Sequence, residues 1–186
     1  VPVRMALAKE GVRTVFNLLG PLINPAQPSY QVMGVYSEHL VEPLSLALSQ
    51  LGVRRGLVVH GRLDGGKSLD KFSTAGKNHV RGVGALEDLV TNYSADDFEL
   101  IPARPEDLQG GDAQENVEVL DAFLAGKANP GLTSTLYLNA GAGLWVMNKT
   151  KSLKEGIQLA RELVEDGAVK TWVDQAREFY QDRTDA

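Results

Sequence analysis

A polar loop at residues 62–73 carries side chains that could bind phosphate or a metal ion. It reads Arg-Leu-Asp-Gly-Gly-Lys-Ser-Leu-Asp-Lys-Phe-Ser, with two carboxylates, Asp64 and Asp70, among three basic residues. Mg²⁺ in proteins is usually held by one or two carboxylates together with substrate phosphates. The residue types therefore fit a phosphate or Mg²⁺ site, and they equally fit a flexible polar surface loop. His60, just before the loop, is of the kind that usually serves as a hydrogen-bonded structural residue.

A second unusual segment lies at residues 13–25. Its apolar side chains are Val15, Phe16, Leu18, Leu19, Leu22 and Ile23. Such a density predicts burial. The segment is nevertheless interrupted at Gly20-Pro21 and stopped at Asn24-Pro25. One interpretation is a short core helix ended by Gly-Pro; the other is a rigid break that lets another group approach the backbone closely.

A strand–helix–strand unit is predicted to position the polar loop. Residues 30–36 are rich in β-branched and aromatic residues and have strand length. Ser37 is expected to cap a helix with apolar residues at helical spacing that ends at Gly52. Residues 55–61 form a second apolar run, typical of a strand covered on both faces. Ligands of such parallel units bind beyond the carboxyl ends of the strands, where the loop at 62–73 follows.

The remaining elements are predicted from shorter signals. Residues 78–80 and 98–101 are expected to be brief strands added antiparallel to the sheet. A capping box of Asp112 and Glu115 predicts a helix ending near Gly126. Further helices are expected over 132–147, with a small-residue patch at 140–143 for close packing, over 153–166 with Ser152 as cap, and over 168–181. A helix end is expected at residues 3–11.

These elements predict an α/β fold, with a central mixed, mainly parallel sheet flanked by helices and a run of C-terminal helices. At 186 residues the chain is expected to form a single domain, 1–186. Because it opens on Val1-Pro2-Val3 without methionine, we expect a fragment of a longer chain.

Composition excludes several classes of function. A formal net charge of −5 argues against nucleic-acid binding as the main activity. The sequence has no cysteine, which excludes disulfides and thiolate chemistry. No apolar run approaches the roughly 20 residues that span a bilayer, so no membrane partner is expected. A cytoplasmic location fits these features.

Several segments together resemble the anthranilate phosphoribosyltransferases. The matching stretches, in order, are Val-Arg at 3–4, Gly-Val-Arg-Thr-Val-Phe-Asn-Leu-Leu-Gly-Pro-Leu-Ile-Asn-Pro at 11–25, Gly-Val-Tyr at 34–36, Val-Val-His-Gly at 58–61, Gly-Gly followed by Glu-Asn at 110–116, and Ser-Leu-Lys-Glu-Gly at 152–156. The resemblance implies an Mg²⁺-dependent transfer of phosphoribose from phosphoribosyl pyrophosphate to anthranilate, with release of pyrophosphate, in tryptophan biosynthesis.

The resemblance also implies where the chain belongs in such an enzyme. It is similar to the C-terminal part of the large α/β domain, of the kind found in nucleoside phosphorylases and class III phosphoribosyltransferases. The N-terminal helical domain and the glycine-rich phosphate-binding loop would precede it. The fragment alone is then expected to be inactive, and the parent protein to be a homodimer.

Roles for individual residues are carried over by position. Gly20 and Pro21 would line the anthranilate pocket, and Arg4 would pair with the anthranilate carboxylate. The spacing between Arg4 and Arg13 is longer than the family pattern. Asp70 matches the first residue of an Asp-Glu pair that holds Mg²⁺. Lys71 stands in place of the glutamate, which would weaken or alter the metal site, and it becomes a possible pyrophosphate contact. No covalent nucleophile is expected.

Two other functions remain open at this point. The substitution at Lys71 favours a non-catalytic relative that acts as a binding protein, for nucleic acid or another partner. The same architecture would also suit a related phosphoribosyltransferase or nucleoside phosphorylase with another acceptor.

Overall fold

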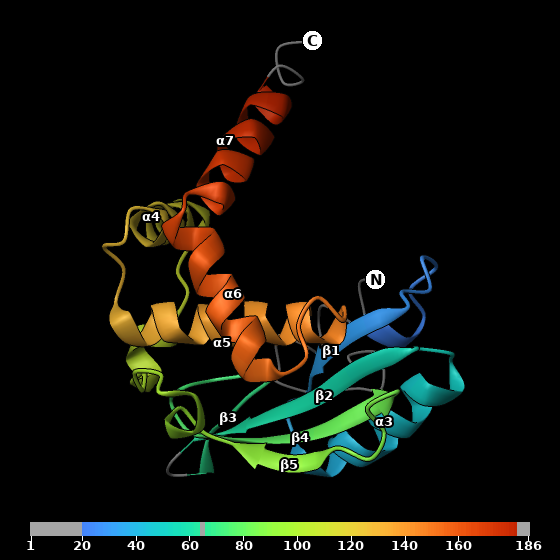
Figure 1. Cartoon of the computed structure of the whole chain (residues 1–186). Coiled ribbons are helices and arrows are strands. Elements are labelled where there is room, and N and C mark those ends of the chain that lie inside the picture. The colour runs from blue at the N-terminus through green and yellow to red at the C-terminus, as the bar shows by residue number, and fades with distance from the viewer. Residues whose placement is uncertain (1–19, 64–65, 182–186) are drawn as a thin grey trace, which may run out of the picture.

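The computed structural model describes residues 20–63 and 66–181, and a strand–helix–strand unit stands at its centre (Figure 1). Strand β1 (Tyr30–Gly34) leads through a short 3₁₀ turn, η1 (Glu38–Leu40), to helix α3 (Val41–Gln50) and strand β2 (Arg55–Arg62). β1 and β2 pair in parallel, with Gly34 opposite Val59. The predicted βαβ unit is confirmed, and Gly52, at φ +85°, follows the end of the helix as expected.

The rest of the sheet is antiparallel. Strands β3 (Ser68–Leu69) and β4 (Lys77–Gly84) both pair with β2, and β5 (Val90–Tyr93) pairs with β4. The main order is β1-β2-β4-β5, with β3 beside β2. The predicted α/β class and mixed sheet are confirmed. Among the described strands, however, one pairing is parallel and three are antiparallel, where the sequence predicts a mainly parallel sheet.

Two local predictions are wrong. Residues 98–101 do not form a strand, because a 3₁₀ turn, η3 (Asp96–Phe98), occupies this region. Asp97 accepts hydrogen bonds from the Ser94 backbone N–H (2.7 Å) and hydroxyl (2.9 Å), which gives the backbone a local alternative to the sheet. Ser37 does not cap α3; its hydroxyl is hydrogen-bonded to His39 Nδ1 (2.7 Å), and the chain first makes the η1 turn.

The central strand β2 is buried on both faces, which explains its apolar run. Val58 and Val83 contact α3 on one face. Leu57, Val59 and Val80 belong to the larger core under α5 (Pro130–Val146) and α6 (Leu153–Glu165) on the other. These five side chains are fully buried. Helices on both faces of the central strands produce the predicted layered α/β arrangement.

The predicted C-terminal helices are confirmed. A short 3₁₀ turn, η4 (Pro105–Leu108), precedes α4 (Ala113–Leu124), which begins with the predicted capping box of Asp112 and Glu115. α5 and α6 approach closely at Gly141, where an added Cβ would lie 2.5 Å from Ile157 N. This is the contact expected of the small-residue patch. Ser152 caps α6 by accepting from the Glu155 N–H (3.2 Å).

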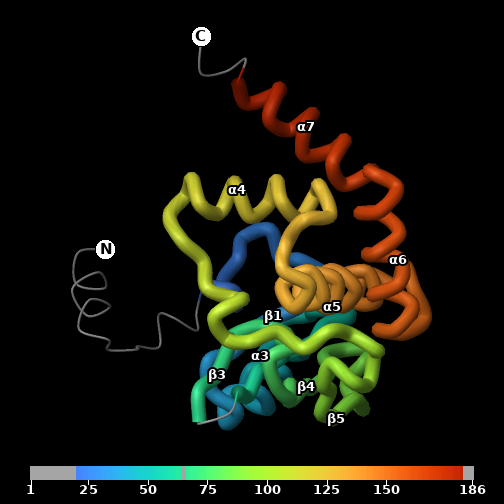
Figure 2. Tube along the Cα trace, turned by 90° about the vertical axis from the view of Figure 1, so that its left-hand side faces the viewer, coloured from blue at the N-terminus to red at the C-terminus, as the bar shows by residue number. Residues whose placement is uncertain are grey.

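α4 and the last helix, α7 (Ala168–Gln181), lie on the side of α5 away from the sheet, and α7 projects from the body (Figures 1 and 2). α7 has no buried residue, and the Trp172 side chain is 68% exposed. Over residues 20–63 and 66–181, no helix combines the length and apolar character needed to cross a bilayer.

Candidate functional site

The backbone of residues 70–71 packs closely against two glycines at the carboxyl ends of the parallel strands. A Cβ on Gly34, the last residue of β1, would lie 1.6 Å from the carbonyl oxygen of Asp70. A Cβ on Gly61, near the end of β2, would lie 2.9 Å from the carbonyl oxygen of Lys71. The Asp70-Lys71 backbone therefore crosses both strand ends at a distance that excludes any larger residue beneath it.

The chain just after these residues is anchored in the core. The ring of Phe72 is fully buried, and its carbonyl accepts a hydrogen bond from Asn139 Nδ2 on α5 (2.9 Å). The fully buried amide of Asn78 accepts from the Ser73 N–H (2.8 Å) and donates to the Ser73 carbonyl (2.9 Å). The predicted flexible loop thus ends in a firmly held segment at residues 72–73.

Two residues of opposite charge, Asp70 and Lys71, lie directly before this held segment. The Asp70 and Lys71 side chains are 64% and 57% exposed, and Lys71 Nζ lies 3.8 Å from Asp70 Oδ1. Within the described residues, no group of three or more histidine or acidic side chains could form a complete metal cage. A single exposed carboxylate fits Mg²⁺ that is also held by substrate phosphates, and does not fit a metal bound by protein alone. The neighbouring ammonium group weakens the attraction of Asp70 for any cation.

Polar residues after β1 and at the end of β2 form the rim of this edge. Arg62 and Glu38 form an ion pair, and the Ser68 hydroxyl donates to the Tyr36 carbonyl (3.0 Å). The hydrogen bond from Arg62 lowers the pKa of the Glu38 carboxyl below its usual value. His60 is 5% exposed and its Nδ1 is hydrogen-bonded to the Val35 carbonyl (2.9 Å), which confirms its predicted structural role.

The Gly20-Pro21 pair, which interrupts the apolar segment at residues 13–25, lies away from Asp70 and Lys71. Both residues are exposed, and no atom of the described residues lies within 4 Å of the place where a Cβ on Gly20 would be. The Pro21 carbonyl accepts a long hydrogen bond from Gln31 Nε2 on β1 (3.5 Å). Leu22 packs on the α3 side of the sheet, whereas Ile23 is 69% exposed. The prediction that this apolar segment is buried therefore holds in part for Leu22 and is wrong for Ile23.

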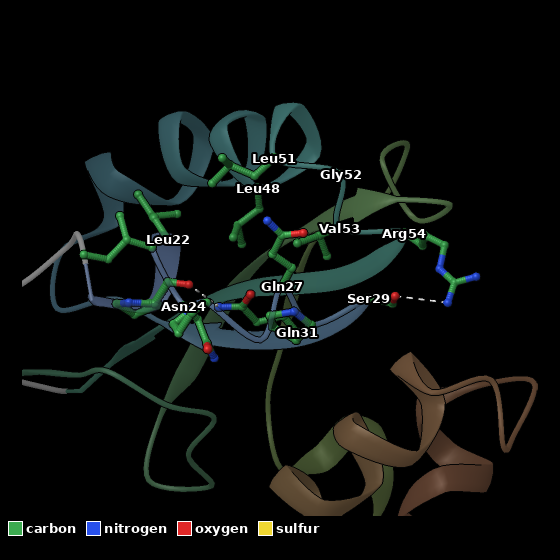
Figure 3. Close-up of a pocket in the computed structure, with 14 residues that line it drawn as sticks. Leu22, Asn24, Gln27, Ser29, Gln31, Leu48, Leu51, Gly52, Val53 and Arg54 are labelled. Atoms are coloured by element: carbon green, nitrogen blue, oxygen red, sulfur yellow. Dashed lines mark hydrogen bonds between the residues drawn. The ribbon is translucent and has the colours of Figure 1, made fainter.

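Pro21 lines a cavity of about 550 Å³ between the chain before β1 and the end of α3 (Figure 3). Apolar residues of the wall include Leu22, Leu48, Leu51 and Val53, and polar ones include Asn24, Gln27, Gln31 and Arg54. The close-up shows the amides of Gln27 and Gln31 within this space and Arg54 directed away towards Ser29. Such a mixed lining can accept a small organic molecule through apolar contact and a few hydrogen bonds.

The structure does not bring the two predicted regions into one pocket. The cavity at Pro21 opens on the α3 face, because Leu22 and the odd-numbered residues of β1 face α3. Asp70 crosses the other face, where the missing Cβ of Gly34 would point. Gln31 and Gly34 are three residues apart, about 10 Å along the strand. Arg4, Arg13, Asp64 and the helix predicted at residues 3–11 lie outside the described residues.

Sequence reasoning missed the residues that fix the site. Asn78, Asn139 and Gly34 have no charge and belong to no motif of metal or phosphate binding. The one available signal was that Gly34 lies near the end of the strand predicted at 30–36, and Gly61 at the end of the strand predicted at 55–61. Glycine at a strand end is compatible with close approach of another backbone.

The chain matches the family model described as "Glycosyl transferase family, a/b domain" over residues 2–170. It is 40% identical over 171 residues to the anthranilate phosphoribosyltransferase of Petrotoga mobilis, covering 91% of this chain and 48% of that protein. It is 43% identical over 167 residues to the enzyme of that name from a Synechococcus strain, covering 89% of this chain and 46% of that protein. The chain thus spans about half the length of the curated relatives it matches.

The solved structures that the chain resembles are also anthranilate phosphoribosyltransferases. The chain superposes on anthranilate phosphoribosyltransferase from Thermus thermophilus with a TM-score of 0.80 and 40% identity, covering 94% of this chain and 49% of that one. The enzyme of that name from Saccharomyces cerevisiae, in complex with phosphoribosyl pyrophosphate and Mg, gives a TM-score of 0.73 and 25% identity, covering 89% and 46%.

Proposed function

Because the chain belongs to the glycosyl transferase family through its α/β domain, we propose that the whole protein transfers the phosphoribosyl group of phosphoribosyl pyrophosphate to anthranilate and releases pyrophosphate. The observation that carries this proposal is the exposed Asp70 carboxylate at the carboxyl ends of β1 and β2. Support comes from the similar yeast enzyme, whose structure contains phosphoribosyl pyrophosphate and Mg.

In the proposed reaction the anthranilate amine attacks the ribose carbon that carries pyrophosphate. The bond to the pyrophosphate oxygen breaks, the amine nitrogen forms the new bond and loses a proton, and no covalent enzyme intermediate is needed. Catalysis then depends on positioning and on stabilising the negative charge of the departing group. Bound Mg²⁺ would supply part of that stabilisation.

Asp70 is the residue we assign to Mg²⁺, and Lys71 to the pyrophosphate itself. One carboxylate beside an ammonium group binds a free cation weakly, so the metal is expected to enter with its phosphate ligand. The ammonium group of Lys71 can approach a phosphate oxygen directly, since its side chain is 57% exposed. In this proposal Lys71 takes over part of the neutralisation of pyrophosphate charge that a metal ion would otherwise supply.

Gly20 and Pro21 are proposed to contact the aromatic acceptor, with Arg4 pairing with its carboxylate. Both residues of the break are exposed and can meet a ligand or another part of the protein. Because they lie away from Asp70 in the described chain, residues outside the described ranges are expected to complete the acceptor site. A cytoplasmic homodimer and inactivity of the 186-residue chain by itself remain parts of the same proposal.

The direct test is an assay of the full-length protein with anthranilate, phosphoribosyl pyrophosphate and Mg²⁺. Saturable loss of anthranilate fluorescence with stoichiometric pyrophosphate release is expected. Transfer to a different acceptor, or binding without turnover, would contradict the proposal in favour of a related transferase or a binding protein.

A further inference from the structure

Asn139 links helix α5 to the segment that displays Asp70. Its side-chain amide donates to the Thr135 carbonyl one turn earlier in the helix (2.8 Å) and to the Phe72 carbonyl across the interface (2.9 Å). The two residues joined across that interface are 67 positions apart in sequence. One amide group is therefore held by the helix backbone and in turn holds the backbone of the loop.

The Asp70 and Lys71 side chains depend on their backbone for position. Both are more than half exposed, so packing does not fix them. Their backbone is limited from below by Gly34 and Gly61, and two residues further on it is fixed by Asn139 and by the buried Phe72 ring. A shift of the Phe72 carbonyl would be transmitted to Asp70 through two peptide units.

A neighbouring pair of threonine hydroxyls adds a second link between α5 and the chain that follows Lys71. Thr74 and Thr135 Oγ1 atoms are hydrogen-bonded to each other (2.7 Å), and the Thr74 N–H donates to Thr135 Oγ1 (3.3 Å). Both threonines are buried. α5 thus contacts the chain at residues 72 and 74, on the C-terminal side of the two charged residues.

We propose that Asn139 is a positioning residue for the metal and pyrophosphate end of the active site. It acts through the Phe72 carbonyl and touches neither substrate nor metal. This inference rests on the proposed function, because it assigns that end of the substrate to Asp70 and Lys71. It adds that one residue of helix α5 sets the position of the groups that bind metal and pyrophosphate. The binding of anthranilate does not depend on this residue.

The test compares two variants of Asn139 with a control on the same helix, all in the full-length protein. Asn139→Leu keeps the size of the side chain and removes the donor, and Asn139→Ala removes the donor while favouring the helix. The control is Ser134→Ala, also on α5. It removes the hydroxyl that accepts a hydrogen bond from the Ile101 N–H (3.1 Å) and leaves the hydrogen bonds of residues 70–74 in place. Circular dichroism and thermal unfolding identify variants that remain folded.

The main measurement is binding of Mn²⁺, followed by its electron paramagnetic resonance signal, in the presence of phosphoribosyl pyrophosphate. Both Asn139 variants are expected to bind about tenfold more weakly, as is typical when an outer-shell partner is removed. The KM for phosphoribosyl pyrophosphate should rise while the KM for anthranilate stays within about twofold. The control should bind Mn²⁺ like the unaltered protein.

Mn²⁺ binding by either folded Asn139 variant that equals the control would overturn the positioning role, and so would an equal rise in both KM values. If the unaltered protein itself shows no binding of Mn²⁺ that depends on phosphoribosyl pyrophosphate, the proposed function fails and this proposal with it. The two failures are therefore distinguished by the behaviour of the unaltered protein.

Discussion

Lys71 Nζ lies 3.8 Å from Asp70 Oδ1, on a segment whose backbone rests against Gly34 and Gly61. The ion pair is exposed and contributes little to stability. Its consequence is electrostatic, because the Asp70 carboxylate that we assign to the metal lies beside a permanent positive charge. The first prediction follows from this arrangement.

Lys71→Glu is expected to strengthen the apparent Mg²⁺ affinity in the presence of phosphoribosyl pyrophosphate. Two unit charges about 4 Å apart interact by about 1 kcal/mol in water, so exchanging positive for negative, a change of two units, should improve the affinity at least about tenfold. The direct contact of Lys71 with pyrophosphate is lost at the same time, and the KM for phosphoribosyl pyrophosphate measured at low Mg²⁺ should rise.

Lys67→Glu is the matched control, because Lys67 is an exposed lysine in the same loop. It should change the Mg²⁺ dependence by no more than about twofold, as expected of a more distant screened charge. Pyrophosphate release and Mg²⁺ dependence that are unchanged in Lys71→Glu would remove Lys71 from the mechanism.

Gly141 and Gly143 on α5 give a pair of substitutions with opposite expected signs. A Cβ on Gly141 would lie 2.5 Å from Ile157 N, whereas a Cβ on Gly143 would have no atom of residues 20–63 or 66–181 within 4 Å. Gly141→Ala should separate α5 from α6 and lower the free energy of unfolding by about 1–3 kcal/mol. Gly143→Ala should raise it by about 0.5–1 kcal/mol, because alanine is the better helix former. Urea unfolding measures both, and a destabilised Gly143→Ala would contradict the described helix packing.

Asn78 is expected to be among the residues most sensitive to substitution. It is fully buried, and its amide satisfies both the N–H and the carbonyl of Ser73. Asn78→Leu should lower the free energy of unfolding by about 2–4 kcal/mol, because these groups would remain buried without partners. Asn92→Leu, at an exposed position on β5, should change it by less than about 0.5 kcal/mol. Equal effects of the two substitutions on urea unfolding would show that residue 73 is not anchored by Asn78.

The Glu38–Arg62 ion pair predicts a small dependence of stability on pH. The Arg62 hydrogen bond is the main cause that lowers the pKa of Glu38 from 4.5, and charges on Arg62, His79 and His60 act in the same direction. A lowered pKa in the folded state means that the contribution is present above pH 4.5 and is lost as the pH falls through the folded-state pKa.

Glu38→Gln should therefore be less stable than the unaltered protein at pH 7, by less than about 1 kcal/mol because both partners are exposed. The difference should shrink in acid below pH 4.5 and at high salt. Thermal unfolding at pH 7 and pH 3.5 measures it. A difference that grows as the pH falls would have the wrong sign for this ion pair.

The sequence was sufficient to predict the elements with regular spacing. The βαβ unit and the C-terminal helices follow from apolar periodicity and from caps such as Asp112 and Ser152, which act over three or four residues. The strand predicted at 98–101 failed because a local interaction, Ser94 with Asp97, competed with the sheet.

The candidate site was predictable only as far as its charged residues. Asp70 and Lys71 could be located at the carboxyl ends of the strands because topology places that loop there. The anchors could not be predicted, since Asn139 meets Phe72 only after α5 has packed on the sheet. Likewise, nothing local indicated that Ile23 would be exposed. A high density of apolar residues predicts burial, but it does not identify the part of the protein against which each side chain packs.

The proposed assignment is tested most directly by measuring pyrophosphate release and anthranilate consumption by the full-length protein and by its Asp70→Asn variant, over a range of Mg²⁺ concentrations. The account predicts equal molar amounts of both from the unaltered protein, and an apparent Mg²⁺ affinity at least about tenfold weaker in the variant. Turnover with the same Mg²⁺ dependence in both proteins would contradict it.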